Sequence, residues 1–255
     1  MPSYQANSPV KATQITLRIV ETLQRLDGAG VTAIAQELDI SKSSAHDYLS
    51  TLRESGYVVK QDSEYSVGLR FLDLGAHARQ KRKIYSEAKN EVDELADETG
   101  EFANLMVEEH GLGIYLHRGV GERAVNVDVH VGRQVHLHNT ALGKALLAHM
   151  SEERVAEIID EHGLPSTTDQ TITDRDHLRE ELDEITNQGV AFDDEERLSG
   201  LRCVAVPILD QDDCAVGAIS ISGPTSRMTE TRYQEELPAR LQQSANVIEL
   251  NVNFS

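Results

Sequence analysis

Residues 40–58, ISKSSAHDYLSTLRESGYV, constrain the fold of this chain more than any other stretch. Ser41 stands where a helix needs an N-cap, and Gly56 stands just past the expected helix end, where a left-handed residue is favoured. One apolar stripe with i, i+4 and i+7 spacing lies between them, formed by Ala45, Leu49 and Leu52. The stretch therefore predicts a short helix with one buried face and one face of small hydrogen-bonding side chains.

The residues before and after this helix predict a winged helix-turn-helix. Apolar residues recur with helical spacing from Ala12 onward, at Ile15, Ile19, Leu23 and Leu26. DGAG at 27–30 ends that helix, and Thr32 is a candidate N-cap for a second short helix. Two short helices joined by a tight turn are typical of a helix-turn-helix. Two β-favouring runs, 57–60 and 65–67, flank a polar turn and predict a hairpin wing.

DNA is the partner that such a module fits best. We expect the helix to enter the major groove of duplex DNA, with base-facing side chains at Lys42, Ser43, Ser44, His46 and Ser50, beside the cap residue Ser41. Arg53 and Lys60 are expected near phosphates. Asp47 is awkward because a carboxylate repels phosphate; it either accepts from a cytosine amino group or points away. The alternative is a small three-helix core with a hairpin, on which His46 is inert.

The charge of the chain is divided unevenly along its length. The formal net charge is −19. Residues 1–83 hold 11 Lys/Arg and 9 Asp/Glu, a net of +2, whereas residues 84–255 hold 13 and 34, a net of −21. Charge asymmetry of this kind indicates a division of labour, in which only the near-neutral part approaches a polyanion. Adaptation to high salt also explains such acidity, and high salt weakens every phosphate contact.

The second part of the chain predicts an α+β domain. A helix over 84–99 has one apolar face and stops at Gly100. The runs FANLMVEE, GIYLHRG and AVNVDVHVG are strand-like. Helices are expected over 141–149, 152–161 and 175–187, with candidate caps Ser151 and Thr173. Strands over 201–209 and 215–222 follow, and a last helix from Thr229 is expected to be interrupted at Pro238. A mixed, mostly antiparallel sheet with helices packed on it is the expected architecture.

Three stretches of the second part could form a binding site. HLHNTALGKALLAHM begins a helix with small residues, which either expose main-chain amides to an anion or simply pack closely on a sheet. FDDEERLSGLRCVAV places carboxylates before the strand that carries Cys203; a solvated acidic loop is the alternative. AISISGP puts Ser220 and Ser222 on one strand face, where they line either a cavity or an exposed edge.

Several other classes of protein are disfavoured. His130, His136 and His138 have no third ligand at a known spacing, so no metal or other cofactor is expected. Catalytic motifs are absent, and an enzyme acting through Cys203 would need a neighbour that stabilises the thiolate. No apolar run of about 18 residues and no secretory signal appear, so we expect no membrane association. The two cysteines lack metal-ligand spacing and favour a reducing, cytoplasmic setting.

Four stretches in order carry a resemblance to a known family: SKSSAHDYLSTLRESGYV, HNTALGKALLA, FDDEERLSGLRCVAVPI and ISISGP. On these motifs the chain resembles the IclR family of transcriptional regulators from about Ile15 to Arg227. The family often has arginine where this chain has Asp47, which puts a contact expected there in doubt. The acidity exceeds that of most bacterial members and points to a haloarchaeal setting.

The resemblance implies a winged helix-turn-helix over residues 1–80, a linker helix region over 81–100 and a GAF- or PAS-like effector-binding domain over 101–255. It implies that main-chain groups of Ala141 and Leu142 hold a small effector, together with residues at the positions of Asp193, Leu201, Cys203, Ser220 and Ser222. An organic acid or sugar-derived acid suits that set. The implied protein is a homodimer or dimer of dimers that binds operator DNA and responds to the effector. The alternative is a small-molecule or metal-sensing module that acts through protein contacts.

Overall fold

The computed structural model describes residues 7–125 and 129–254. The chain divides into two compact units, one ending at Arg79 and one starting at Gln80. Each unit has its own apolar core. Within the described ranges, no helix is both long and apolar enough to cross a membrane.

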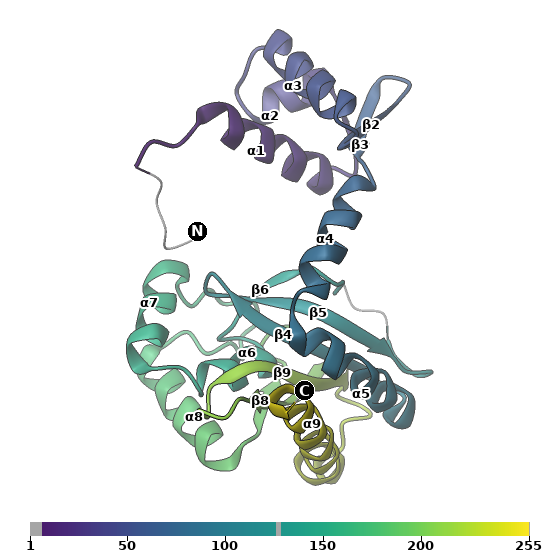
Figure 1. Cartoon of the computed structure of the whole chain (residues 1–255). Coiled ribbons are helices and arrows are strands. Elements are labelled where there is room, and N and C mark those ends of the chain that lie inside the picture. The colour runs from purple at the N-terminus through teal and green to yellow at the C-terminus, as the bar shows by residue number, and fades with distance from the viewer. Residues whose placement is uncertain (1–6, 126–128, 255) are drawn as a thin grey trace. The chain divides into compact units, whose positions relative to one another are not determined.

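The first unit is a three-helix bundle with a small sheet. Its elements in chain order are α1 (Lys11–Arg25), β1 (Ala29–Gly30), α2 (Val31–Glu37), α3 (Lys42–Glu54), β2 (Val58–Gln61), β3 (Glu64–Val67) and α4 (Arg70–Gln80) (Figure 1). Strand β3 pairs antiparallel with both β1 and β2. The β2–β3 hairpin follows α3 directly, so this unit is a winged helix-turn-helix.

Helix α3 has the caps and the buried stripe that its sequence predicts. The Ser41 Oγ accepts from the Ser44 amide at 3.0 Å. At the other end, the Gly56 amide donates to the Arg53 carbonyl and the Tyr57 amide to the Leu52 carbonyl, with Gly56 at φ 77°. This pair of bonds is a Schellman closure, which requires a left-handed residue at the position of the glycine. The predicted stripe, Ala45, Leu49 and Leu52, is buried in the core of the first unit.

Two details of the first unit differ from expectation. Helix α2 starts earlier than predicted, because Gly30 occupies the N-cap position and Thr32 lies inside the helix. Strand β1 ends at the same glycine, so the backbone passes from extended to helical there without a side-chain cap. Leu26 is 37% exposed because it is the C-cap of α1, where the helical stripe has already ended.

The second unit is built on one six-stranded sheet in the order β6-β5-β4-β9-β8-β7. Its strands are β4 (Phe102–Glu109), β5 (Leu112–Val120), β6 (Gln134–His136), β7 (Ala191–Asp194), β8 (Leu201–Leu209) and β9 (Ala215–Pro224). Every pairing found among these strands is antiparallel, so the parallel component of a mixed sheet does not occur in the described sheet. The combination of this sheet with helices confirms the expected α+β class.

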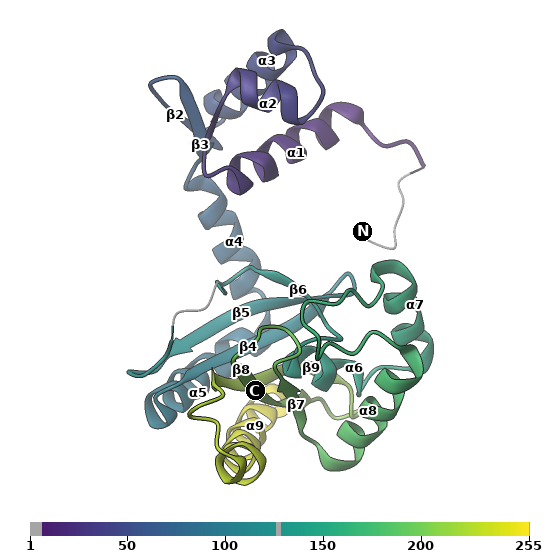
Figure 2. The same ribbon diagram turned by 180° about the vertical axis from the view of Figure 1, so that it is seen from behind.

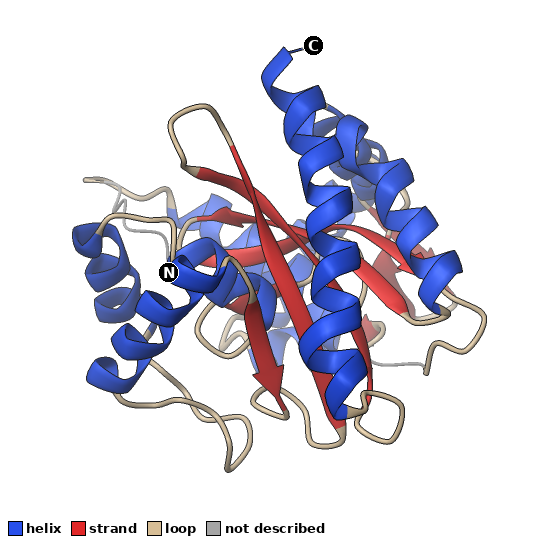
Figure 3. Ribbon diagram, turned by 90° about the horizontal axis from the view of Figure 1, so that it is seen from below, coloured by secondary structure: helices blue, strands red, loops and turns tan. Residues whose placement is uncertain are grey.

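Helices cover both faces of this sheet, as Figures 2 and 3 show. One face carries α5 (Lys83–Thr99) and α9 (Leu237–Phe254); the other carries α6 (Ala141–Leu147), α7 (Glu152–His162) and α8 (Arg175–Gln188). Helix α5 is the predicted 84–99 helix, and its apolar residues lie in the first of these cores. It ends at Gly100, which has φ 73°. Whether residues 81–100 act as a separate linker stays a prediction.

Three local expectations for the second unit need correction. Asp174, not Thr173, caps α8, and its carboxylate accepts from the His177 amide. Residues 126–128 of the run AVNVDVHVG lie outside the described residues, and its described flanks are not strand; β6 follows them instead. Pro238 does not interrupt the last helix. A π-helical turn, η1 (Arg232–Glu236), precedes it, and this wider turn accommodates the ring and missing amide of proline.

Candidate functional site

Sheet register brings the predicted effector residues into one place. Asp193 of β7 pairs with Cys203 of β8, which pairs with Ser222 of β9. In the next row of the same face, Ser220 of β9 pairs with Asn104 of β4. Because residues paired across neighbouring strands share a face, these side chains form a polar floor under α6.

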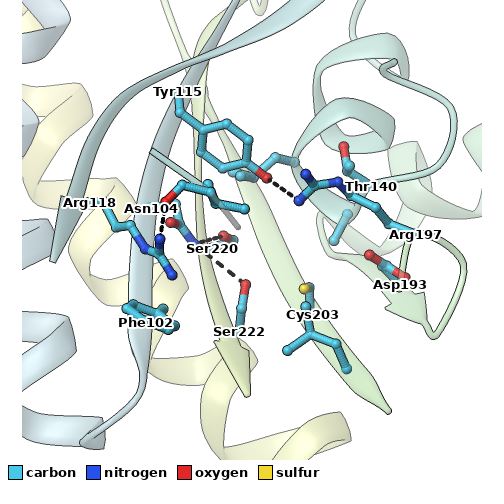
Figure 4. Close-up of a pocket in the computed structure, with 14 residues that line it drawn as sticks. Phe102, Asn104, Tyr115, Arg118, Thr140, Asp193, Arg197, Cys203, Ser220 and Ser222 are labelled. Atoms are coloured by element: carbon cyan, nitrogen blue, oxygen red, sulfur yellow. Dashed lines mark hydrogen bonds between the residues drawn. The ribbon is translucent and has the colours of Figure 1, made fainter. Parts of the chain in front are cut away.

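A narrow cavity of about 20 Å³ lies over this floor (Figure 4). All seven residues expected around an effector line it: Ala141, Leu142, Asp193, Leu201, Cys203, Ser220 and Ser222. The remaining described residues of the wall are Phe102, Asn104, Tyr115, Arg118, Val129, Thr140 and Arg197. The structure thus places the predicted set together; that these residues bind an effector stays a prediction.

A β-bulge explains why sequence periodicity missed two wall residues. Leu105 pairs with His117, and the next residue, Met106, pairs with Tyr115, so Leu116 is an extra residue in β5. The bulge breaks the alternation of faces, and it lets both Tyr115 and Arg118 line the cavity although they are three positions apart. His117 instead contacts Asp93 of α5 at 2.7 Å on the opposite face.

The first turn of α6 forms the roof of the cavity. The Thr140 Oγ caps α6 by accepting from the Gly143 amide at 2.9 Å. A Cβ atom at Gly143 would lie 2.1 Å from the Leu137 carbonyl oxygen, so no other residue fits there without moving backbone. The sequence signal of small residues in TALGK therefore reflects close packing, and that packing also places Ala141 and Leu142 against the cavity.

Two arginines supply positive charge to the wall. Figure 4 shows Arg118 and Arg197 on opposite sides of the cavity, with Ser220 and Ser222 between them. The Arg118 guanidinium stacks over the Phe102 ring at 3.5 Å from its centroid and donates to the Val129 carbonyl. Burial lowers the pKa of Arg118. Arg197 donates to the Tyr115 hydroxyl at 3.3 Å.

Asp193 is the one carboxylic acid among the described residues of the wall, and its ionisation is altered. It is 2% exposed, and burial, followed by the negative charge of Glu196, raises its pKa to about 7. Lys144 and the amides of Glu196 and Arg197 act in the opposite direction. Near neutral pH this carboxyl is therefore partly protonated, and a protonated carboxyl can donate a hydrogen bond to an acceptor in the cavity.

The neighbouring thiol is not set up for nucleophilic chemistry. Burial and then the Asp193 carboxylate raise the pKa of Cys203 well above its ordinary value, and burial raises the pKa of Tyr115 to about 12. A reactive cysteine needs the opposite, an electropositive setting that favours the thiolate. This wall therefore fits reversible binding better than covalent catalysis.

The raised pKa of Asp193 predicts how stability depends on pH. The folded protein holds this proton more tightly than the unfolded chain, so between about pH 4 and pH 7 its contribution to stability falls as pH rises. Asp193→Asn removes this loss. The variant should gain stability relative to the wild type by about 2–4 kcal/mol between pH 4 and pH 8, measured by urea unfolding.

A stability difference between Asp193→Asn and the wild type that stays constant over this pH range would show that the Asp193 carboxyl ionises normally.

Three imidazoles of the second unit form a small group of rings. The His136 ring centroid lies 5.7 Å from that of His138 and 6.2 Å from that of His162. Burial lowers the pKa of His138 to about 4, and His138 Nε2 lies 3.2 Å from the Pro165 carbonyl. Among the described residues, no group of three or more His, Cys, Asp or Glu side chains is placed to hold a metal ion.

The DNA-facing residues expected on α3 and the wing are mostly exposed. Those exposed are Ser41, Lys42, Ser43, His46, Asp47, Ser50, Arg53 and Lys60. Ser44 is half-buried, and its hydroxyl lies 2.9 Å from that of Ser41, so it contributes to the cap. On the wing, the Lys60 Nζ lies 5.2 Å from the centroid of the Tyr65 ring.

The helical repeat places Asp47 among the residues expected to read bases. Ser43, Asp47 and Ser50 follow i, i+4 and i+7 spacing, so they share one strip. The Asp47 carboxylate lies 3.6 Å from His46 Nδ1, and its side chain is 77% exposed. If α3 enters a groove with Ser43 and Ser50 facing the bases, Asp47 therefore faces the bases too.

A winged helix-turn-helix joined in one chain to a domain with a polar, arginine-lined cavity defines a ligand-responsive DNA-binding regulator. Residues 12–62 match the IclR helix-turn-helix domain, and residues 76–250 match the family described as bacterial transcriptional regulator IclR C-terminal. The chain belongs to the IclR family of transcriptional regulators. It has the DNA-binding and effector-binding domains of that family.

Similar proteins cover more than nine-tenths of the chain. It is 31% identical to the probable HTH-type transcriptional regulator ArcR of Halobacterium salinarum, over 92% of this chain and 91% of that protein. It is 32% identical to the HTH-type transcriptional regulator KdgR of Escherichia coli, over 92% and 90%. The crystal structure of the Thermotoga maritima IclR has a TM-score of 0.78 and 31% identity, and the match covers 96% of this chain and 98% of that one.

Proposed function

We propose that the cavity of the second unit holds a small carboxylic acid, of the organic-acid or sugar-acid class, and that its binding alters the affinity of the first unit for operator DNA. The observation that carries this proposal is the pair of guanidinium groups, Arg118 and Arg197, in one partly closed cavity. Guanidinium groups bind carboxylates through charge-assisted hydrogen bonds. Partial protonation of Asp193 reduces the opposing negative charge in the same wall.

Neutral polar groups of the wall would recognise the rest of the acid. Asn104 Nδ2 lies 3.3 Å from the Ser220 Oγ and 3.4 Å from the Ser222 Oγ, so the three side chains form a connected set of donors and acceptors. Such a set suits hydroxyl or keto oxygens. The Phe102 ring adds an apolar side.

Operator binding is assigned to the exposed side of α3 and to the wing. We propose that Lys42, Ser43, His46 and Ser50 face the major groove, with Ser44 beside them at the helix start. Arg53 and Lys60 lie near phosphates in this proposal. Asp47 would accept a hydrogen bond from a cytosine amino group, an exocyclic donor that is exposed in the major groove.

We further propose that the protein acts as a homodimer or dimer of dimers in the cytoplasm, and not as an enzyme. Helix α4 supports self-association because it buries no residue of its own, and Leu69, Leu72 and Leu74 beside and on it are 84%, 68% and 48% exposed. A cluster of exposed leucines marks an association surface. Sedimentation velocity at the protein concentrations used for DNA binding measures the assembly directly.

The test of the effector class is a thermal-shift screen of small acids against matched neutral molecules. Sugar acids, hydroxy acids, keto acids and aromatic acids are each compared with the corresponding amide or alcohol. 4-Hydroxybenzoate belongs in the panel, since an IclR homologue of Microbacterium hydrocarbonoxydans, 22% identical to this chain, has been solved in complex with it. An acid should raise the melting temperature and its neutral analogue should not; equal responses would overturn the proposed class.

A further inference from the structure

Lys144 is a buried cation that does not line the cavity. It lies in α6, is 1% exposed, and its Nζ contacts Glu181 Oε1 at 2.7 Å and Glu196 Oε1 at 2.5 Å. Lysine is rarely buried unless its charge is paired, because desolvation of an ammonium group is costly. Both carboxylates raise the pKa of Lys144 against the effect of burial, so the lysine stays charged. Such an arrangement calls for a structural or functional reason.

Glu196, one of the two partners of Lys144, lies in the turn that follows β7. The Glu196 carbonyl accepts hydroxyl hydrogen bonds at 2.9, 3.0 and 2.6 Å from Thr167, Thr168 and Thr171. The Glu196 amide donates to Asp193 Oδ1 at 2.8 Å. The main chain of this turn is therefore held from one side by threonines and from within by Asp193.

Among the described residues, the Glu196 carboxylate receives its hydrogen bond from Lys144 alone. Its Oε1 receives the ammonium group, while its Oε2 is buried and has no hydrogen-bond partner within the described residues. Without the lysine, the carboxylate would be a buried charge with no hydrogen-bond donor for its side chain among the described residues. The Glu196 side chain therefore links the turn to α6 through Lys144.

The same turn supplies two residues of the cavity wall, Asp193 and Arg197, and Arg197 follows Glu196 directly in sequence. We propose that Lys144 is a positioning residue of the effector site: by pairing with Glu196 and Glu181 it holds the 193–197 turn against α6 and thereby keeps Asp193 and Arg197 in place around the cavity. This inference rests on the proposed function in treating the cavity as the effector site. It adds Lys144, which does not line the cavity, to the residues on which the effector site depends.

Thiol chemistry at Cys203 tests the proposal without any acid. Cys203 lines the cavity next to Asp193, and Cys214 is exposed, so all variants carry Cys214→Ser. In Lys144→Met, release of the turn should open the wall and raise the rate of Cys203 alkylation by iodoacetamide at least about tenfold. Lys89→Met, at an exposed lysine of α5, is the matched control and should react at the wild-type rate.

A second comparison separates positioning from mere stability. Lys144→Met leaves two buried carboxylates unpaired, so it also destabilises the fold. The triple variant Lys144→Met/Glu181→Gln/Glu196→Gln removes these charges and should regain much of that stability while Cys203 remains rapidly alkylated. Leu241→Ala, in the core on the opposite face of the sheet, supplies a destabilised protein in which the turn is intact and Cys203 should stay protected.

Each outcome decides the proposal. Rapid alkylation in the lysine variant and the triple variant, with slow alkylation in Leu241→Ala, supports it. Alkylation at the wild-type rate in Lys144→Met overturns it, and so does protection that returns with stability in the triple variant. Because the assay uses iodoacetamide only, failure of every acid to bind would refute the proposed effector class and leave this result standing.

Discussion

Replacing Arg197 with alanine is expected to weaken carboxylic acid binding about 10- to 100-fold, since a charged hydrogen bond contributes about 1.5–3 kcal/mol. The Arg197 guanidinium lines the cavity, donates to the Tyr115 hydroxyl and lies 5.9 Å from the centroid of the Tyr115 ring, so its removal should leave the fold little changed. Isothermal titration calorimetry with the best acid from the screen measures the loss. Arg118 is a less clean target because it also stacks on Phe102.

The control for Arg197 is Arg240→Ala. Arg240 is half exposed on α9 and pairs with Glu98, away from the cavity wall. Its replacement should leave acid affinity within error of the wild type. If Arg197→Ala retains full affinity, the acid does not use this guanidinium, and the charge argument for the effector class is wrong.

The double variant Lys42→Ala/Lys60→Ala should bind any duplex more weakly and with a flatter salt dependence. Each lost phosphate contact lowers the slope of log K against log salt by about 1, so the double variant should lose about 2. Fluorescence anisotropy at several salt concentrations measures both the affinity and the slope. Both lysines are exposed and lie outside the first unit's core, so folding should not be affected.

Lys89→Ala, which removes one exposed lysine of α5, is the control for this pair. It changes the net charge of the acidic second unit and should leave the salt slope unchanged. An unchanged slope in the double variant would mean that α3 and the wing do not meet phosphate, and the DNA-facing side would have to be sought elsewhere.

The charge distribution is central to how this protein approaches DNA. Residues 1–83 carry a net charge of +2 and residues 84–255 a net charge of −21. A near-neutral domain can approach a duplex without strong repulsion, whereas a strongly acidic domain cannot. We therefore assign all DNA contacts to the first unit. The acidic second unit then has one cavity wall with two arginines, a local reversal of its overall sign.

Local signals in the sequence were enough to predict the winged helix-turn-helix. Caps and glycines act over a few residues, so Ser41 and Gly56 marked the ends of α3 correctly. Cap prediction failed where tertiary structure intervenes, as at Thr32, where a strand runs straight into α2. Helix α4 went unpredicted because its leucines face solvent and give no buried stripe.

The cavity could be predicted only in part. Ser220 and Ser222 were found because strand alternation puts them on one face, and the family resemblance added Asp193 and Cys203. Tyr115 and Arg118 could not be found by alternation, since the bulge at Leu116 changes the face between them. Arg197 lies in an acidic stretch whose sequence is also typical of a solvated loop. The contact between Lys144 and Glu196 joins residues 52 positions apart, so local sequence patterns could not predict it.

The most direct test of the account is an operator titration in which the best acid of the screen is added to the protein and to its Arg197→Ala variant. Duplex DNA from upstream of the chain's own gene is the probe, and anisotropy measures its dissociation constant at each acid concentration. The account predicts that the acid changes the operator affinity of the wild type several-fold and that the variant needs about 10- to 100-fold more acid for the same change. An operator affinity that stays constant in the wild type up to saturation with the acid would contradict it.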